Sequence, residues 1–186
     1  MTVKHPVLLT LAIGALVPGA AAPAAVAEPA KPTKTRWATV NICDTVANPD
    51  TLGVRASVPG NGTSERIYMR FRAEYFDRSR KAWRPVKGQG VLPFVHAGSA
   101  RFRTRETGYR FLFPSDTAAT FQLRGRVQVE YRRARTGRGE RVVRRVALIT
   151  SSGVVSRSPA EGDPRGYSAA RCEMKVEPRP EPDPLP

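Results

Sequence analysis

Residues 120–132 read TFQLRGRVQVEYR, and this stretch decides the fold class. Apolar side chains alternate along it with polar or charged ones, and Gly125 takes the place of one apolar residue. A period of two with one apolar and one polar face is typical of a half-buried antiparallel strand. The apolar face comprises Phe121, Leu123, Val127, Val129 and Tyr131. Gly125 in the same register predicts a bulge or a close crossing of backbone.

A second stretch, residues 66–75, reads RIYMRFRAEY and alternates in the same way. Its apolar face comprises Ile67, Met69, Phe71, Ala73 and Tyr75. The polar faces of the two stretches carry six arginines: Arg66, Arg70, Arg72, Arg124, Arg126 and Arg132. Alternate residues in a strand lie about 6.6–6.8 Å apart, and arginine can hold a phosphate or carboxylate through two hydrogen bonds. If the two strands are neighbours, we expect one patch suited to a polymer with repeating anionic groups. The alternative is an ordinary solvated sheet face.

Other short runs of strand-forming residues predict strands at 37–43, 52–58, 82–86, 100–104, 109–113, 141–150 and 167–174. We expect turns at 48–50 and 136–139, an Asn-Gly hairpin signal at 61–62, and an irregular segment at 87–98. A slip in the apolar phase at Arg144 predicts a bulge. Eight or nine short strands, with no helical periodicity after residue 27 and no internal repeat, predict an all-β fold. The single-domain length favours an antiparallel β-sandwich over a barrel.

The first 27 residues have the pattern of a secretory signal peptide. Lys4 supplies a positive charge, residues 7–17 are apolar, and residues 25–27, Ala-Val-Ala, form a cleavage site. The apolar run is shorter than the roughly 20 residues that span a bilayer, so we expect export and no membrane span. We then expect a linker at 28–35, one domain at 36–174, and a disordered proline-rich tail at 175–186.

Two cysteines, Cys43 and Cys172, follow the predicted signal. An even number of cysteines in an oxidising compartment predicts one disulfide. Two free thiols and a metal site are the alternatives, although His96 is the only histidine after residue 27 and makes a metal site a poor one. A disulfide between these positions would join the first expected strand to the last.

The chain carries 31 Lys and Arg against 16 Asp and Glu, which gives a formal charge of +15. A field of this sign attracts polyanions, and outside a cell these include anionic polymers of the envelope. The alternative is that GC-rich codons favour arginine and that the charge serves only solvation.

No catalytic constellation is recognisable. His96 is the one candidate base and Ser99 lies near it, but the Gly-x-Ser-x-Gly nucleophile turn is absent. The acidic residues of the expected domain are few, and we interpret most of them as partners in weak surface ion pairs. The main ones are Glu65, Glu74, Asp77, Glu106, Asp116, Glu130 and Glu140. We expect no catalytic residue, no metal and no cofactor.

Residues 119–145, after a proline-bearing turn at 114–116, resemble the last two strands of an immunoglobulin or fibronectin type III-like domain. A tyrosine corner often occupies the position of Phe121 in those families, and Phe121 has no hydroxyl. From Arg36 to Met174 the chain is similar to secreted immunoglobulin-like proteins of GC-rich, actinobacterial-type bacteria, including the Arg-rich hairpin and the final YSAARC. The resemblance implies an immunoglobulin-like sandwich and carries over no activity.

These features together predict a secreted, non-catalytic interaction or adhesion module that binds an anionic cell-envelope polymer through its arginines. One alternative is an extracellular structural domain, or a domain that binds another protein, without polyanion specificity. A further alternative is an enzyme with an unrecognised site. Nucleic acid is not an expected partner, because binding of single strands by base stacking needs several aromatic residues and the polar faces carry only Tyr68.

Overall fold

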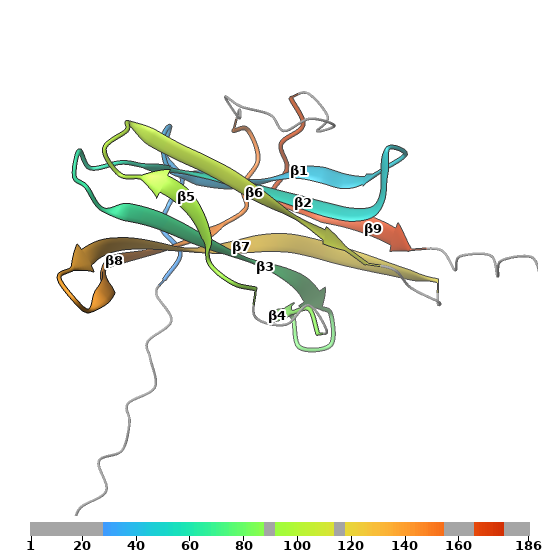
Figure 1. Ribbon diagram of the computed structural model, residues 1–186. Coiled ribbons are helices and arrows are strands. Elements are labelled where there is room, and N and C mark those ends of the chain that lie inside the picture. Colours follow the sequence, from blue (N-terminus) through green and yellow to red (C-terminus); the bar gives the residue numbers. More distant parts are fainter. Residues whose placement is uncertain (1–27, 88–91, 114–117, 155–165, 177–186) are drawn as a thin grey trace, which may run out of the picture.

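The computed structural model describes residues 28–87, 92–113, 118–154 and 166–176, and all regular elements in these ranges are β-strands (Figure 1). They are β1 (Trp37–Thr45), β2 (Asn48–Pro59), β3 (Arg66–Asp77), β4 (Ala82–Pro85), β5 (Val95–Ser99), β6 (Thr104–Leu112), β7 (Ala119–Arg135), β8 (Gly139–Ile149) and β9 (Cys172–Val176). The all-β prediction is confirmed. The expected signal peptide and residues 177–186 of the expected tail lie outside the described ranges. Within these ranges no helix has the length and apolarity to cross a membrane.

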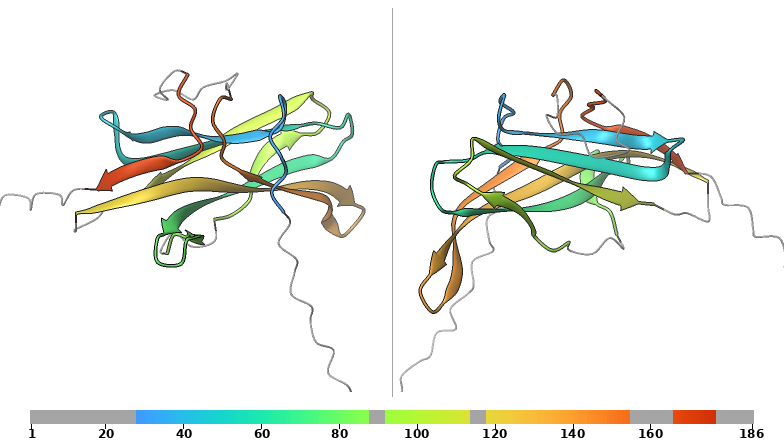
Figure 2. Two further views of the ribbon diagram at one scale, coloured as in Figure 1. Left: turned by 180° about the vertical axis from the view of Figure 1, so that it is seen from behind. Right: turned by 45° about the horizontal axis from the view of Figure 1, so that its top comes forward.

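The strands form two antiparallel sheets that lie face to face (Figures 1 and 2). One sheet has the order β1-β2-β6. The other is built on β4-β3-β7-β8, with β5 paired to β3 and β9 paired to β7. Immunoglobulin-type sandwiches place strands A, B, E and D in one sheet and C, F and G in the other. The order is compatible with that architecture if β1, β2 and β6 correspond to A, B and E, and β3, β7 and β8 to C, F and G. Strand D then has no counterpart in the described three-stranded sheet, and β4, β5 and β9 are additions to the larger one.

The two alternating stretches of sequence form the centre of the larger sheet. β3 and β7 pair without interruption from Arg66 opposite Arg132 to Tyr75 opposite Leu123. Because apolar residues pair with apolar residues throughout, one face of both strands is buried against the other sheet. Met69 and Val129, for example, lie opposite each other and are fully buried. The arginines consequently lie on the outer face.

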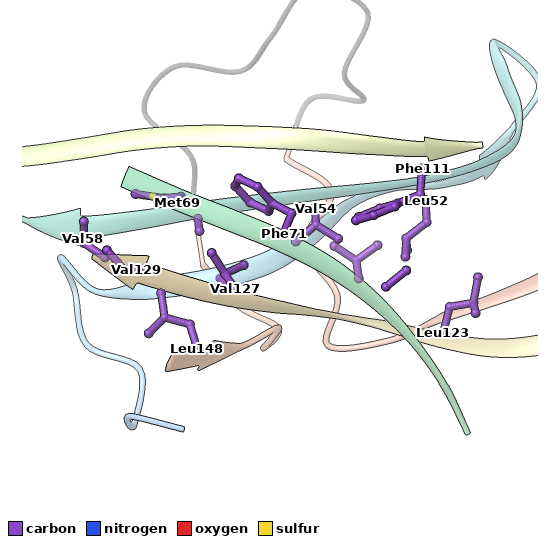
Figure 3. Close-up of a cluster of buried hydrophobic side chains, with 14 of the residues drawn as sticks. Leu52, Val54, Val58, Met69, Phe71, Phe111, Leu123, Val127, Val129 and Leu148 are labelled. Atoms are coloured by element: carbon purple, nitrogen blue, oxygen red, sulfur yellow. The ribbon is translucent and has the colours of Figure 1, made fainter. Parts of the chain in front are cut away.

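The core lies between the sheets and draws side chains from both (Figure 3). Its labelled members are Leu52, Val54, Val58, Met69, Phe71, Phe111, Leu123, Val127, Val129 and Leu148. At Gly125 a Cβ would lie 2.5 Å from Cγ1 of Val54, so glycine permits a close approach of the sheets. The register with β3 passes through Gly125 without a shift, so the bulge alternative is wrong at this position. The close neighbour is a side chain of the opposite sheet rather than backbone.

Covalent and polar links join the two sheets. Cys43 of β1 and Cys172 of β9 form the predicted disulfide, with their Cα atoms 5.4 Å apart. Val40 and Ala169 exchange backbone hydrogen bonds of 2.9 and 3.0 Å just before that strand. The Tyr131 hydroxyl on β7 donates a 2.6 Å hydrogen bond to the Pro59 carbonyl on β2. The two cysteines are 129 positions apart in the sequence. In the chain-entropy account, a disulfide that closes so long a loop stabilises the fold by roughly 4–5 kcal/mol.

The expected domain boundaries fall inside ordered segments. In the expected linker, Pro29 forms a bridge to Ala147 of β8, and the Ala30 amide donates a 2.8 Å hydrogen bond to the Ala147 carbonyl. At the other end β9 extends to Val176, which is buried. The predicted last strand at 167–174 is displaced, since regular pairing with β7 begins at Cys172.

Two of the predicted turns are wrong. The first reversal uses Val46 and Ala47, and residues 48–50 belong to β2. The Asn-Gly signal at 61–62 does not close a hairpin, because β2 and β3 lie in different sheets and residues 60–65 cross between them. The signal still marks a tight bend, since Gly62 adopts a φ of 76°.

The region between β4 and β7 also differs from expectation. The segment predicted as irregular, 87–98, contains most of β5, which is short and lacks alternation. The two strands predicted at 100–104 and 109–113 are replaced by a turn followed by the single strand β6. The predicted bulge near Arg144 is confirmed, because Tyr131 pairs with Arg144 and Arg132 with Val142, which leaves Val143 as the extra residue.

Candidate functional site

The structure brings all six candidate arginines onto one surface. Arg66, Arg70, Arg72, Arg124, Arg126 and Arg132 lie on the outer side of β3 and β7, and we call this surface the arginine face. Arg66 is directly opposite Arg132, and Arg72 is directly opposite Arg126. Like charges in these positions destabilise a sheet unless they are compensated. The neighbours of each guanidinium therefore decide how much free charge the surface presents.

Glu74 compensates one end of the arginine face. Nε of Arg124 donates a 2.8 Å hydrogen bond to Oε2 of Glu74, and Nη2 lies 2.7 Å from the same oxygen. Nη1 of Arg126 lies 3.8 Å from Oε1. The Glu74 side chain is only 6% exposed. This is a buried carboxylate held by two cations, and the prediction of a weak surface ion pair is wrong for it.

Glu130 has the same role in the middle of β7. Arg132 lies 2.8 Å from one carboxylate oxygen and Arg145 of β8 lies 3.1 Å from the other, while the Glu130 side chain is 6% exposed. At the end of the surface, Arg66 forms a 3.0 Å ion pair with Glu140. Four of the six arginines on the arginine face thus have a carboxylate partner in the part of the chain that the structure describes.

Aromatic rings supply a second kind of partner that the strand pattern did not predict. The guanidinium carbon of Arg132 lies 4.2 Å from the ring centre of Tyr68 and 4.8 Å from that of Phe94. Arg70 lies 4.7 Å from the Phe94 ring, and Arg124 lies 4.3 Å from the Trp83 ring. Trp83 lies on β4, and Phe94 immediately precedes β5. Contact of Trp83 and Phe94 with the arginines could not be predicted from the sequence, because it depends on the pairing of β4 and β5 with β3.

Arg70 and Arg72 are the members of the arginine face that form no ion pair with a described residue. Arg70 donates a 2.6 Å hydrogen bond to the neutral amide oxygen of Gln128. Arg72 is exposed, and it has no ion pair with any residue that the structure describes. Arg72 is therefore available to an external anion, and the half-buried Arg70, which also stacks on Phe94, adds a charge that no described carboxylate neutralises.

A more strongly basic element lies at the end of the larger sheet, and the alternation of residues in β3 and β7 did not predict it. The hairpin of β7 and β8 carries Arg133, Arg135, Arg138, Arg141 and Arg144, which we call the basic hairpin. All five are exposed. Arg133 alone has a carboxylate partner among the described residues, at 2.6 Å from Glu65. The run RRARTGRGERVVRR at 132–145 was a sequence signal for this element.

Glu65 is the buried carboxylate at the base of this hairpin. Its side chain is 5% exposed and accepts a 2.7 Å hydrogen bond from the Asn61 amide as well as the bond from Arg133. The bond from Asn61 is the largest of the effects that lower the pKa of Glu65, and Arg133 adds to it. Burial opposes this change in pKa but does not outweigh it.

The described residues provide few other starting points for chemistry. His96 is exposed on β5 and lies against Tyr68, with ring centres 5.1 Å apart. No group of three His, Cys, Asp or Glu side chains among these residues is placed to hold a metal. A cavity of about 320 Å³ lies between the sheets and is lined by Tyr75, Val86, Lys87, Phe113, Phe121 and Leu123. Its described walls are mostly hydrocarbon, so they offer few polar groups to orient a ligand.

Comparison with known proteins gives no match to a protein-family model, to a curated protein or to a solved structure.

Proposed function

We propose that this chain is an exported, non-catalytic, immunoglobulin-like module that binds an anionic polymer of the cell envelope through its arginine face. The observation that carries the proposal is the register of β3 and β7, which gathers six arginines on one outer surface. Among the described residues, three carboxylates, Glu74, Glu130 and Glu140, form ion pairs with those six. The excess of positive charge centres on Arg70 and Arg72.

Export is supported by the sequence pattern at residues 1–27 and by the disulfide between Cys43 and Cys172. Disulfides persist mainly in oxidising compartments. The immunoglobulin-like assignment is supported by the strand order.

Retention on heparin-agarose tests the polymer-binding proposal. We expect the wild-type protein to elute well above about 150 mM salt, because several phosphate-like contacts give a steep dependence on salt. The variant Arg70→Gln/Arg72→Gln removes the two uncompensated charges without disturbing a buried carboxylate, and should elute earlier. The matched control Arg101→Gln/Arg103→Gln removes two exposed charges from the turn before β6.

Elution of the wild type below about 150 mM salt would count against polyanion binding. Equal elution of the two double variants would contradict the assignment to the arginine face.

A second candidate is a surface that binds another protein. The observation that favours it is the stacking of Arg70, Arg124 and Arg132 on Phe94, Trp83 and Tyr68. Arginine and aromatic side chains are enriched at protein interfaces, where charge is often paired rather than free. Weak retention of the wild type on heparin, with no change in elution for Arg70→Gln/Arg72→Gln, would favour this candidate.

A further inference from the structure

The basic hairpin differs from the rest of the positively charged surface in its position. Its turn, residues 136–138, extends past the three-stranded sheet (Figure 2). It is therefore reachable from several sides, whereas the arginine face is flanked by β4, β5 and β8.

The register places most of these charges on one side of the ribbon. Arg133 is directly opposite Arg141, and Arg135 lies two positions further along the same face. The bulge at Val143 returns Arg144 to this face, opposite Tyr131. Without the bulge, Arg144 would lie on the opposite side. One face of a two-stranded ribbon thus carries four arginines, and Arg138 lies at the turn.

The charge of this face is almost uncompensated. Glu65 pairs with Arg133, and Arg144 stacks on the buried Tyr131 ring at 5.0 Å. Arg135, Arg138 and Arg141 have no ion pair with any described residue. Like charges directly opposite each other destabilise a two-stranded ribbon. An external anion would remove this repulsion, so the hairpin gains more from a bound polyanion than a compensated surface does.

We propose that the basic hairpin is a second, separate binding surface for a linear polymer bearing phosphate or sulfate groups. The inference rests on the proposed function in so far as both concern anionic polymers, but it assigns different residues. Arginine suits tetrahedral oxyanions because its planar guanidinium donates two parallel hydrogen bonds. Residues two apart on the ribbon repeat at about 6.6–6.8 Å, which matches a chain of repeated charges better than a single ion.

Other polyanionic partners fit this surface less well. Hairpins and helices that enter a lipid surface combine basic residues with Trp, Phe or Leu, and the turn here is Thr136-Gly137-Arg138. Single-stranded nucleic acid would require aromatic rings for base stacking. Between residues 131 and 144 the aromatic residue is Tyr131, and its ring is buried beneath Arg144.

The test compares three full-length proteins: wild type, Arg135→Gln/Arg138→Gln/Arg141→Gln, and a matched control, Arg78→Gln/Lys81→Gln/Arg84→Gln. The control removes three exposed cations from the hairpin of β3 and β4, at the opposite end of the sheet. Binding to polyphosphate and to dextran sulfate is measured by titration calorimetry at several salt concentrations. The two polymers distinguish phosphate from sulfate as the preferred group.

We expect the basic hairpin variant to lose at least about tenfold in affinity, and its slope of log K against log salt to fall by about 2–3, one for each lost contact. The control should change much less. If the wild type binds and the two triple variants lose affinity equally, the hairpin assignment is overturned while polyanion binding stands. If the wild type binds neither polymer, the proposed function itself fails. Binding of the wild type to anionic phospholipid vesicles, with neither polymer bound, would overturn the polymer in favour of a membrane.

Discussion

The arginine face and the basic hairpin share residue type, sheet and strand, yet they differ in electrostatic state. On the arginine face, four of six guanidinia contact a carboxylate of a described residue, and several stack on aromatic rings. On the basic hairpin, one of five contacts a carboxylate of the described residues. On the first surface, most guanidinia are paired with buried carboxylates or stacked on rings, as charged groups in a protein interior are. The second is a set of like charges held close together.

This difference shows that the number of arginines in a sequence does not measure the charge that a protein presents. Glu74 and Glu130 occur within alternating strands, so their neighbours on the sheet are set by register. The basic hairpin extends past the other sheet, so its arginines have few neighbours among the described residues that could neutralise their charge. Stability should therefore depend on the arginines that pair with buried carboxylates, such as Arg124. Binding of an anion should depend on the arginines of both surfaces that have no ion pair with a described residue.

The largest expected effect is that of Arg124→Ala on stability. The substitution removes the closest partner of the buried Glu74 carboxylate and the stack on Trp83. We expect the free energy of unfolding to fall by about 2–4 kcal/mol, because the remaining charge is left buried with only a distant partner. Urea denaturation measures this. Arg72→Ala, two residues from Glu74 and without an ion pair to a described residue, is the control and should change stability by less than about 0.5 kcal/mol. If both variants lost the same free energy of unfolding, the ion pair with Glu74 would make no special contribution to stability.

An intermediate effect is expected at the one carboxylate that serves the basic hairpin. Glu65→Gln should destabilise the protein at neutral pH by about 1–3 kcal/mol, because it weakens the bonds from Asn61 and Arg133 in a buried setting. In the wild type the pKa of Glu65 is lowered below its ordinary value of 4.5. Its contribution is therefore complete above that value and is lost as the pH falls through the lowered pKa.

The difference in stability between wild type and Glu65→Gln should consequently shrink as the pH falls below about 4.5, the ordinary value. Denaturation at a series of pH values measures it. A difference that is constant from pH 7 to pH 3 would show that the carboxylate charge has no part in the effect.

The sequence was sufficient to predict the two strands that carry the arginines and the face that they share. Strict alternation in 66–75 and 120–132 leaves only one way to bury both strands. The disulfide was likewise predictable, because two cysteines leave one pairing. The crossing at 61–62 was not predictable, since an Asn-Gly bend is the same local structure whether the chain returns to its own sheet or passes to the other. β5 was missed because its five residues show no period of two.

The partners that neutralise or cover the arginines of the arginine face could not be predicted from the spacing of residues in the sequence. Trp83 and Phe94 lie outside β3 and β7, and they reach the arginines only because β4 and β5 pair with β3. The carboxylates were visible, but their burial depends on the crowding of neighbouring side chains. The basic hairpin was recognisable as a charge run, and its one-sidedness depends on the bulge at Val143.

Reversing the charge of Arg141 should change stability only slightly. Arg141→Glu replaces a like-charge pair with Arg133 by an opposite-charge pair. We expect the free energy of unfolding to rise by about 0.2–1 kcal/mol, the usual contribution of a cross-strand ion pair. Thermal denaturation at low salt measures the gain, and the gain should diminish in 1 M salt, where exposed charges are screened. The same substitution should weaken binding to polyphosphate, so that stability and binding change in opposite directions. A loss of stability would show that Arg133 and Arg141 do not repel each other, and the hairpin would then resemble the compensated arginine face.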